Sequence, residues 1–175
     1  MAGITVMGID PSLRSTGVAV LGCDPDRVYS IKTSRLNQAD AIGMVADKIL
    51  KEARDVDFTF IEGYAFGKFG GSSSVSVLIE LSGVLKYELR KLGYKFIVVP
   101  PTVVKKYLTG SGNSNKDKMM LSCYRKFGLE FETSDECDAY ALADLGYHTV
   151  SHEPRRNLTK AELEVIQRVR DDGQF

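Results

Sequence analysis

Residues 4–17, ITVMGIDPSLRSTG, constrain the fold most, because they place an acidic residue at the end of a short apolar strand. The first half of this stretch is rich in β-forming residues, whereas Pro11 and the small residues after it impose a turn directly behind Asp10. A charged side chain is costly to bury unless it is paired or binds a metal ion. Asp10 is therefore either a turn-capping residue or a ligand.

The same pattern, an apolar strand that stops at a carboxylate, occurs a second time. Residues 56–61 are typical of a strand, and Glu62 and Gly63 end it. A third acidic position follows the sequence TSDE at residues 133–136, which matches a capping box and predicts a helix over residues 134–149. Asp135 and Asp138 then share one face of the first turn of that helix.

The order of the predicted elements indicates an α/β fold. Apolar runs and turn signals predict strands near residues 4–9, 17–22, 27–33, 56–61 and 95–99, and helical spacing predicts helices near residues 38–54, 75–92, 101–108, 115–127 and 134–149. This order favours a five-stranded mixed sheet flanked by helices. In such a sheet Asp10 and Glu62 end neighbouring strands, and the last helix can bring Asp135 and Asp138 over them.

The charge pattern is more informative than the net charge. The 175 residues carry 23 basic and 23 acidic side chains and are 43% hydrophobic, which fits one globular domain and indicates neither a nucleic acid nor a membrane as partner. Residues 101–128 contain six basic residues and one acid, whereas residues 129–153 contain seven acids and neither Lys nor Arg. A basic segment followed by an acidic one suits a nuclease, although charge alone favours the simpler interpretation of two solvated surfaces of opposite charge.

The cysteine count predicts a cytoplasmic protein. Three cysteines without CxxC spacing support neither a disulfide framework nor a zinc site, which indicates a reducing compartment. No apolar run is long enough for a transmembrane helix, so no membrane association is expected.

Four converging carboxylates predict metal-dependent chemistry. Such a cluster repels itself strongly unless divalent cations are bound. Oxygen ligands without His or Cys favour Mg²⁺ or Mn²⁺, and two such ions about 4 Å apart suit in-line phosphodiester cleavage.

These motifs resemble a known family in their order and spacing. GIDPSLRSTG at Asp10, FIEGYAFG at Glu62 and SDECDAYALA at Asp135 and Asp138 are similar to motifs of the RuvC-type Holliday junction resolvases of the RNase H-like superfamily. VVKKYLTGSGNSNKDK resembles the basic segment of that family. The family commonly has Gly where this chain has Ser12.

The resemblance implies an RNase H-like nuclease domain over residues 1–150, followed by a helical tail over residues 151–175 that lies outside it. It implies that the protein is a homodimeric, Mg²⁺-dependent endodeoxyribonuclease that cuts branched DNA. The metal ligands are then Asp10, Glu62, Asp135 and Asp138, while Lys105 and Lys116 occupy the two lysine positions near the scissile phosphate. The family occurs in bacteria and in bacteriophages, so a bacterial cell or a phage-infected host is expected.

The residues after Glu62 predict a mobile loop that contacts DNA. Tyr64, Phe66 and Lys68 lie in a glycine- and serine-rich stretch, where the aromatics suit either packing or stacking on bases. Lys116 is expected to stabilise the transition state, and Lys105 and Lys118 to contact phosphate, although surface lysines often serve solubility alone.

Simpler interpretations remain open for the acids. Asp10 could be a turn residue, Glu62 an exposed strand end and Asp135 a helix-start residue. Asp144, two turns beyond Asp138, is expected to be a solvated helix residue.

Rival functions also remain open at this stage. They are a general or flap-cutting nuclease, a non-catalytic junction-binding protein, and an actin-like or sugar-kinase ATPase, whose second lobe has no room in this length. The helix predicted at residues 75–92 is apolar on more than one side, which suits packing on the sheet and on a second subunit.

Overall fold

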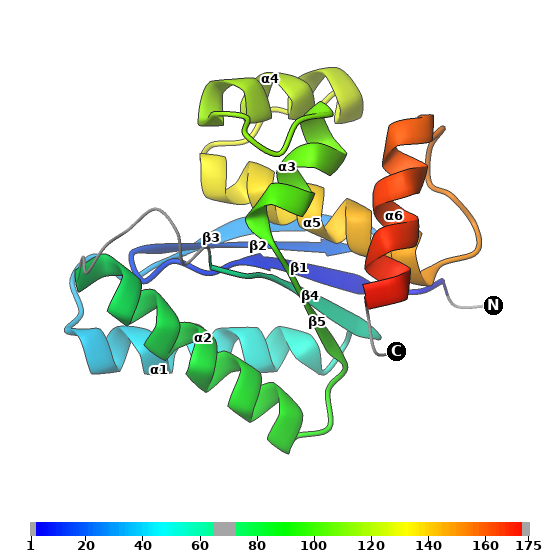
Figure 1. The fold of residues 1–175 in the computed structure, drawn as a ribbon. Coiled ribbons are helices and arrows are strands. Elements are labelled where there is room, and N and C mark those ends of the chain that lie inside the picture. The colour runs from blue at the N-terminus through cyan, green and yellow to red at the C-terminus, as the bar shows by residue number, and fades with distance from the viewer. Residues whose placement is uncertain (1–2, 65–72, 173–175) are drawn as a thin grey trace.

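A five-stranded mixed sheet forms the centre of the molecule (Figure 1). The computed structural model describes residues 3–64 and 73–172. The strands are β1 (Val6–Asp10), β2 (Ser15–Leu21), β3 (Arg27–Lys32), β4 (Phe58–Glu62) and β5 (Phe96–Val99). Their order is β3-β2-β1-β4-β5, with β1, β2 and β3 antiparallel and β4 and β5 added in parallel. The predicted mixed sheet is confirmed.

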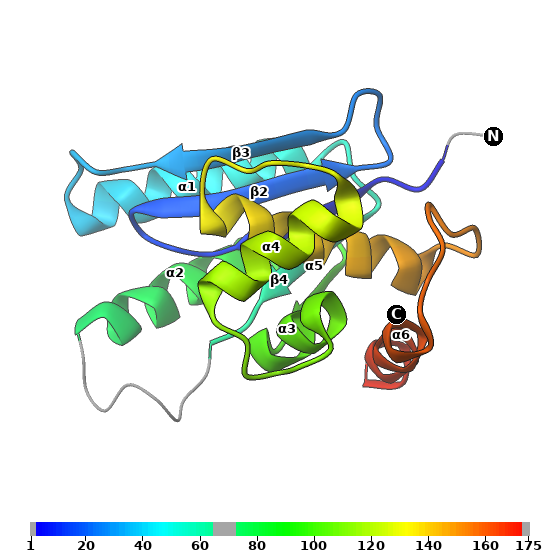
Figure 2. The ribbon, with the colours of Figure 1, turned by 90° about the horizontal axis from the view of Figure 1, so that it is seen from above.

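Helices cover both faces of the sheet. They are α1 (Gln38–Ala53), α2 (Ser73–Lys91), α3 (Pro101–Thr109), α4 (Lys116–Phe127), α5 (Ser134–Val150) and α6 (Lys160–Asp172). Figures 1 and 2 show α1 and α2 on one face and α5 across the other, with α3, α4 and α6 packed around α5. The elements predicted up to residue 149 are all present, with no end shifted by more than two residues. None of the helices in the described part of the chain is long and apolar enough to cross a membrane.

The alternation of side chains along β1 determines where Asp10 points. Met7 and Ile9 belong to the hydrophobic core formed with α1 and α2, whereas Val6 belongs to the core on the α5 side. Gly8 also faces α5, because a Cβ atom built on it would lie 2.3 Å from the carbonyl oxygen of Ala139. Successive side chains of a strand point to opposite faces, so Asp10 faces α5 as well.

The tail folds back onto the α5 side of the molecule. Helix α6 buries Val165, Ile166 and Val169 in the same core as residues of α3 and α5. Its packing adds a third helix beside α5, as Figure 2 shows. The tail is therefore attached to the helix that carries Asp135 and Asp138.

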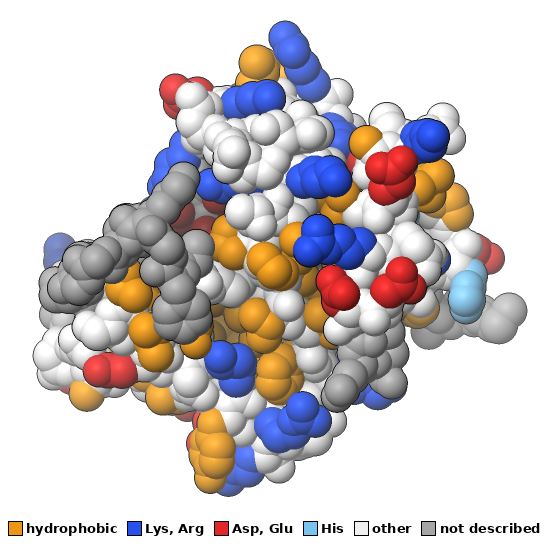
Figure 3. Space-filling view, viewed as in Figure 1, with side chains coloured by type: hydrophobic (Ala, Val, Ile, Leu, Met, Phe, Trp, Pro, Cys, Tyr) orange, Lys and Arg blue, Asp and Glu red, His pale blue; other side chains and the backbone are white. Residues whose placement is uncertain are grey.

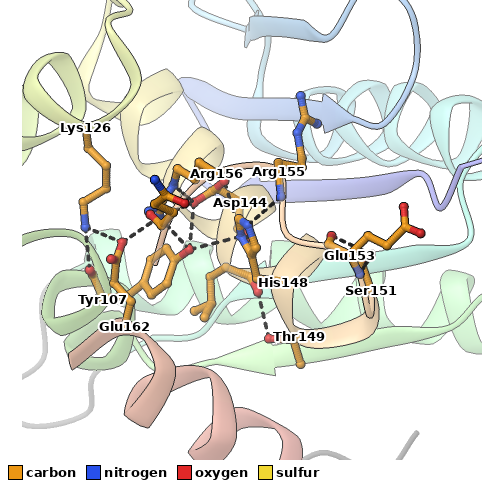
Figure 4. Close-up of polar contacts among 12 residues, drawn as sticks. Tyr107, Lys126, Asp144, His148, Thr149, Ser151, Glu153, Arg155, Arg156 and Glu162 are labelled. Carbon is orange, nitrogen blue, oxygen red and sulfur yellow. Dashed lines mark hydrogen bonds and ion pairs between the residues drawn. The ribbon is translucent and has the colours of Figure 1, made fainter. Parts of the chain in front are cut away.

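A buried polar network secures the tail (Figure 4). The Arg156 Nη2 donates to Asp144 Oδ2 at 2.8 Å and to Glu162 Oε1 at 2.6 Å. The Tyr107 hydroxyl donates to the same Asp144 oxygen at 2.7 Å, and Lys126 Nζ donates to Glu162 at 2.7 Å. Burial alone would raise the pKa of Glu162, but the hydrogen bonds from Arg156 and Lys126 outweigh it and lower that pKa to about 2.

Asp144 corrects one expectation from the sequence. It is only 3% exposed, whereas a solvated helix residue was predicted. Its charge is tolerated in the interior because Arg156 and Tyr107 both donate hydrogen bonds to it.

Candidate active site

A groove opens where β1 and β4 end, beside the first turn of α5. Its volume is about 1050 Å³, and all four predicted acids line it: Asp10, Glu62, Asp135 and Asp138. Lys105 from α3 and Lys116 from α4 also line it. We call this feature the carboxylate groove.

Asp10 and Glu62 reach the groove because they end adjacent parallel strands. The register pairs Ile9 with Ile61, so the two acids that follow these residues lie side by side. Their carboxyl groups lie close enough for each to shift the pKa of the other. Two neighbouring carboxyl groups resist carrying negative charge at the same time.

Burial dominates the electrostatics of this pair. It raises the pKa of Asp10 well above its usual range, and the negative charges of Glu62 and Asp138 raise it further. Burial also raises the pKa of Glu62 to about 7, although the hydrogen bond from Asp10 and the charge of Lys105 act in the opposite direction. Both groups therefore keep their protons to higher pH than ordinary surface carboxyl groups do.

The predicted start of α5 at Ser134 is confirmed with Thr133 as its cap, and Glu136 ties this first turn to the sheet. Thr133 is the cap residue, and its hydroxyl accepts from the Glu136 amide at 3.2 Å. The buried Glu136 side chain accepts from the Ser30 hydroxyl on β3 at 2.7 Å and from the Glu132 amide at 3.1 Å. This attachment holds the first turn of α5 in place at the groove.

Asp135 and Asp138 project from that first turn. Burial raises the pKa of Asp138 to about 6, while the positive charges of Lys116 and Lys105 act to lower it. The Oδ1 atom of Asp138 is buried and has no hydrogen-bond partner within the described residues. A buried carboxylate oxygen without a donor is costly unless a cation completes its surroundings.

The predicted lysines differ in their relation to the groove. Lys116 Nζ donates to the Ser134 hydroxyl at 3.2 Å, beside the acids of α5. The positive charge of Lys105 acts to lower the pKa of both Glu62 and Asp138. Lys118 is exposed and lies outside the residues that line the groove. Figure 3 shows Lys and Arg side chains over the upper part of the molecule, where α3 and α4 lie.

The loop residues are only partly described by the structure. Tyr64 follows β4, and Lys86 Nζ lies 5.4 Å from the centroid of its ring. Phe66 and Lys68 lie outside the described residues.

One groove residue was missed by the sequence analysis. Arg14, in the turn between β1 and β2, lines the groove, and its Nη1 donates to the Leu36 carbonyl at 3.3 Å. The available signal was a single basic residue four positions after Asp10, in a turn otherwise made of small and apolar residues.

The side chains of the groove offer the kind of donor atoms that hard divalent cations prefer. The acids supply only oxygen donors, the orphaned Asp138 oxygen needs a positive partner, and Mg²⁺ and Mn²⁺ prefer such ligands. Within residues 3–64 and 73–172, no three Asp, Glu, His or Cys side chains are already close enough to hold one ion.

Comparison with known proteins supports the family resemblance. No family model matches the chain. It is 25% identical over 158 residues to the crossover junction endodeoxyribonuclease RuvC of Synechococcus sp. (strain CC9311), covering 81% of this chain and 97% of that protein. It is 29% identical over 150 residues to the same enzyme of Sulfurovum sp. (strain NBC37-1), covering 80% and 92% of the two chains.

Two solved structures share the fold. The Thermus thermophilus RuvC structure has a TM-score of 0.63 at 21% identity, covering 80% of this chain and 91% of that one. T. thermophilus RuvC in complex with Holliday junction substrate has a TM-score of 0.65 at 22% identity, covering 80% and 90%. The predicted RNase H-like fold and the resemblance to the RuvC type are confirmed.

Proposed function

We propose that this chain, a RuvC-type protein by sequence and fold, is a metal-dependent endonuclease that cuts four-way DNA junctions. One observation carries the proposal: the carboxylate groove collects four acids from three separate elements and sets two lysines beside them. The curated relatives are named as crossover junction endodeoxyribonucleases, and a structure of similar fold was solved with Holliday junction DNA. Both findings favour the same substrate.

Asp10, Glu62, Asp135 and Asp138 are the residues that would hold Mg²⁺ or Mn²⁺. Two such ions, when bound, stabilise the attacking and leaving oxygens of an in-line phosphodiester displacement. The strand ends fix Asp10 and Glu62, whereas the capped start of α5 fixes the other two acids.

The basic residues act on the DNA itself. Lys116 lies beside the acids of α5, so its ammonium group can donate to the charge that develops on the scissile phosphate. Lys105 and Arg14 line the same groove and neutralise flanking phosphates, and Lys118 contacts the backbone further out. Tyr64, Phe66 and Lys68 are proposed to contact unpaired bases at the junction centre.

A homodimer is the assembly that suits this reaction. A junction is resolved by two cuts of like polarity, which two identical sites related by a twofold axis can supply. Helix α2 buries Leu81, Leu85 and Leu89 in the monomer core, while Ile79 and Tyr87 remain exposed on its other side. A Cβ atom on Gly83, between them, would meet nothing within 4 Å. This face of α2 is our proposed dimer interface.

The substrate class can be tested directly with purified protein. Incubation with a four-way junction, a flap and a plain duplex should give cleavage of the junction alone, and only with Mg²⁺ or Mn²⁺. Preferential cutting of the flap or the duplex would instead indicate a general or flap-cutting nuclease. Junction binding without cleavage under any metal condition would indicate a non-catalytic binding protein.

Because the substrate is intracellular DNA and the three cysteines are free, we propose a cytoplasmic location.

A further inference from the structure

A row of three residues on neighbouring strands crosses the sheet beside the carboxylate groove. Gly17 on β2 is the register partner of Asp10 on β1, and Glu62 ends the next strand. Directly paired residues of antiparallel strands point to the same face, so Gly17, like Asp10, faces α5. The row therefore consists of two acids and, next to them, a residue without a side chain.

Gly17 lies directly beneath the first turn of α5. A Cβ atom built on Gly17 would lie 2.0 Å from the Asp135 carbonyl oxygen, 2.5 Å from its carbonyl carbon and 3.1 Å from the Glu136 nitrogen. All three are backbone atoms, which cannot rotate away as a side chain can. Gly17 does not have a positive φ angle, so the requirement for glycine here is one of space and not of backbone conformation.

This contact links the distance between the first turn of α5 and the sheet, here called the height of α5, to the positions of the four acids. Real Cβ atoms essentially never approach another heavy atom closer than 3.0 Å, so a side chain at position 17 would raise the first turn by about 1 Å. Asp135 and Asp138 would move with the helix, while Asp10 and Glu62 would stay on their strands. A displacement of about 1 Å is enough to disrupt a site whose groups must converge on one centre.

We propose that Gly17 is a positioning residue that sets the height of the first turn of α5, so that its two acids converge with Asp10 and Glu62 on the same cations. This inference rests on the proposed function, because it assumes that the groove binds divalent metal. The simpler interpretation is that Gly17 only allows close packing of helix on sheet.

Gly146 provides the matched control for that interpretation. It lies near the other end of α5, where a Cβ atom would come within 2.5 Å of the Phe60 ring. Gly146→Ala therefore disturbs the packing of the same helix on the same sheet, far along the helix from the acids. A purely structural role for Gly17 predicts that the two alanine variants behave alike.

The test compares Mn²⁺ binding to the wild-type protein, Gly17→Ala and Gly146→Ala, without DNA, by electron paramagnetic resonance or calorimetry. Both variants should unfold at lower temperature than the wild-type protein in EDTA. Gly17→Ala should bind Mn²⁺ at least about tenfold more weakly, as expected when a support of metal ligands is displaced, whereas Gly146→Ala should keep its affinity. Junction cleavage by Gly17→Ala should also require more Mg²⁺.

Equal Mn²⁺ affinity in Gly17→Ala and the wild-type protein would overturn the inference, as would equal weakening in both variants. If the wild-type protein itself bound no Mn²⁺, the proposed function would fail, and this inference with it. If Gly17→Ala does not fold, Ser30→Ala carries the test, because it removes the hydroxyl that ties Glu136 to β3 and adds no atom. Weaker Mn²⁺ binding by Ser30→Ala would support the inference, and unchanged binding would contradict it.

Discussion

Asp10 and Glu62 end adjacent parallel strands, and their carboxyl groups lie close enough for each to shift the pKa of the other. Burial raises the pKa of both groups, so the groove retains a proton that an ordinary pair of surface acids would lose near neutral pH. The arrangement is costly without a cation and becomes favourable when one binds. The stability of the metal-free protein should report this cost.

The first prediction is that the metal-free protein loses stability as the pH rises from 5 to 8. The folded protein holds protons on Glu62 up to a pKa of about 7, whereas the unfolded chain releases them near 4.5. Because the folded state binds more protons in this window, its free energy of unfolding falls with pH, on the order of 2 to 3 kcal/mol for Glu62. Urea unfolding in EDTA at pH 5 and pH 8 measures the change.

Two controls accompany that measurement. Glu62→Gln should reduce the pH dependence to the part that Asp10 and Asp138 contribute, and added Mg²⁺ should restore the stability of the wild-type protein at pH 8. Stability that rises from pH 5 to pH 8 in EDTA would contradict the raised pKa. Glu162 does not interfere, because its pKa is lowered to about 2 and its contribution is lost only as the pH falls below about 4.5.

The second prediction separates Lys116 from Lys118. Lys116→Ala should lower the single-turnover cleavage rate by about a hundredfold with little loss of junction affinity, because its charge acts mainly in the transition state. Lys118→Ala, the control on the same helix, should weaken binding modestly and reduce its salt dependence while the rate at saturation stays normal. If Lys116→Ala instead weakened junction binding and left the single-turnover rate normal, Lys116 would be an ordinary contact to the DNA backbone.

The third prediction concerns the exposed face of α2. Tyr87 is 65% exposed in the monomer, and Tyr87→Glu places a charge on this apolar face. The wild-type protein should sediment as a dimer at micromolar concentration and the variant as a monomer, because a buried unpaired charge at an interface is costly. Tyr124→Glu is the control, since Tyr124 is 53% exposed on α4, away from α2. A monomeric wild-type protein, or dissociation by both variants, would exclude α2 as the interface.

The fourth prediction concerns the tail, which we propose to be a stabilising segment outside the nuclease domain of residues 1–150. Arg156→Met leaves Asp144 and Glu162 without a shared buried cation and should cost about 3 to 5 kcal/mol of unfolding free energy. Arg168→Met, which removes an exposed ion pair with Asp172, should cost less than about 1 kcal/mol. Chemical denaturation measures both, and equal losses would show that the network does not anchor the tail.

The elements that position the acids could be predicted from the sequence because local patterns determine them. Short apolar runs define β1 and β4, and the turn residues behind Asp10 and Glu62 locate both strand ends. The capping box likewise locates the start of α5, since Thr133 and Glu136 act within one turn.

The remaining features depend on residues that lie far apart in the chain. Asp144 was expected in solvent because nothing near it in helix α5 signals a buried charge, and its partner Arg156 comes from the tail. The role of Gly17 depends in the same way on the helix start at Asp135, which packs on it from far along the sequence. Such contacts appear only when the helix is placed on the sheet.

Mapping the cuts in a mobile four-way junction tests the central claim most directly. The wild-type protein with Mg²⁺ should cut two strands of like polarity at symmetry-related positions and give nicked duplexes that ligase can seal. Glu62→Gln should bind the junction at least as tightly but leave it intact, because the acid serves metal and its charge repels phosphate. Unpaired nicks in one strand, or near-normal cleavage by Glu62→Gln, would contradict a metal-dependent junction resolvase.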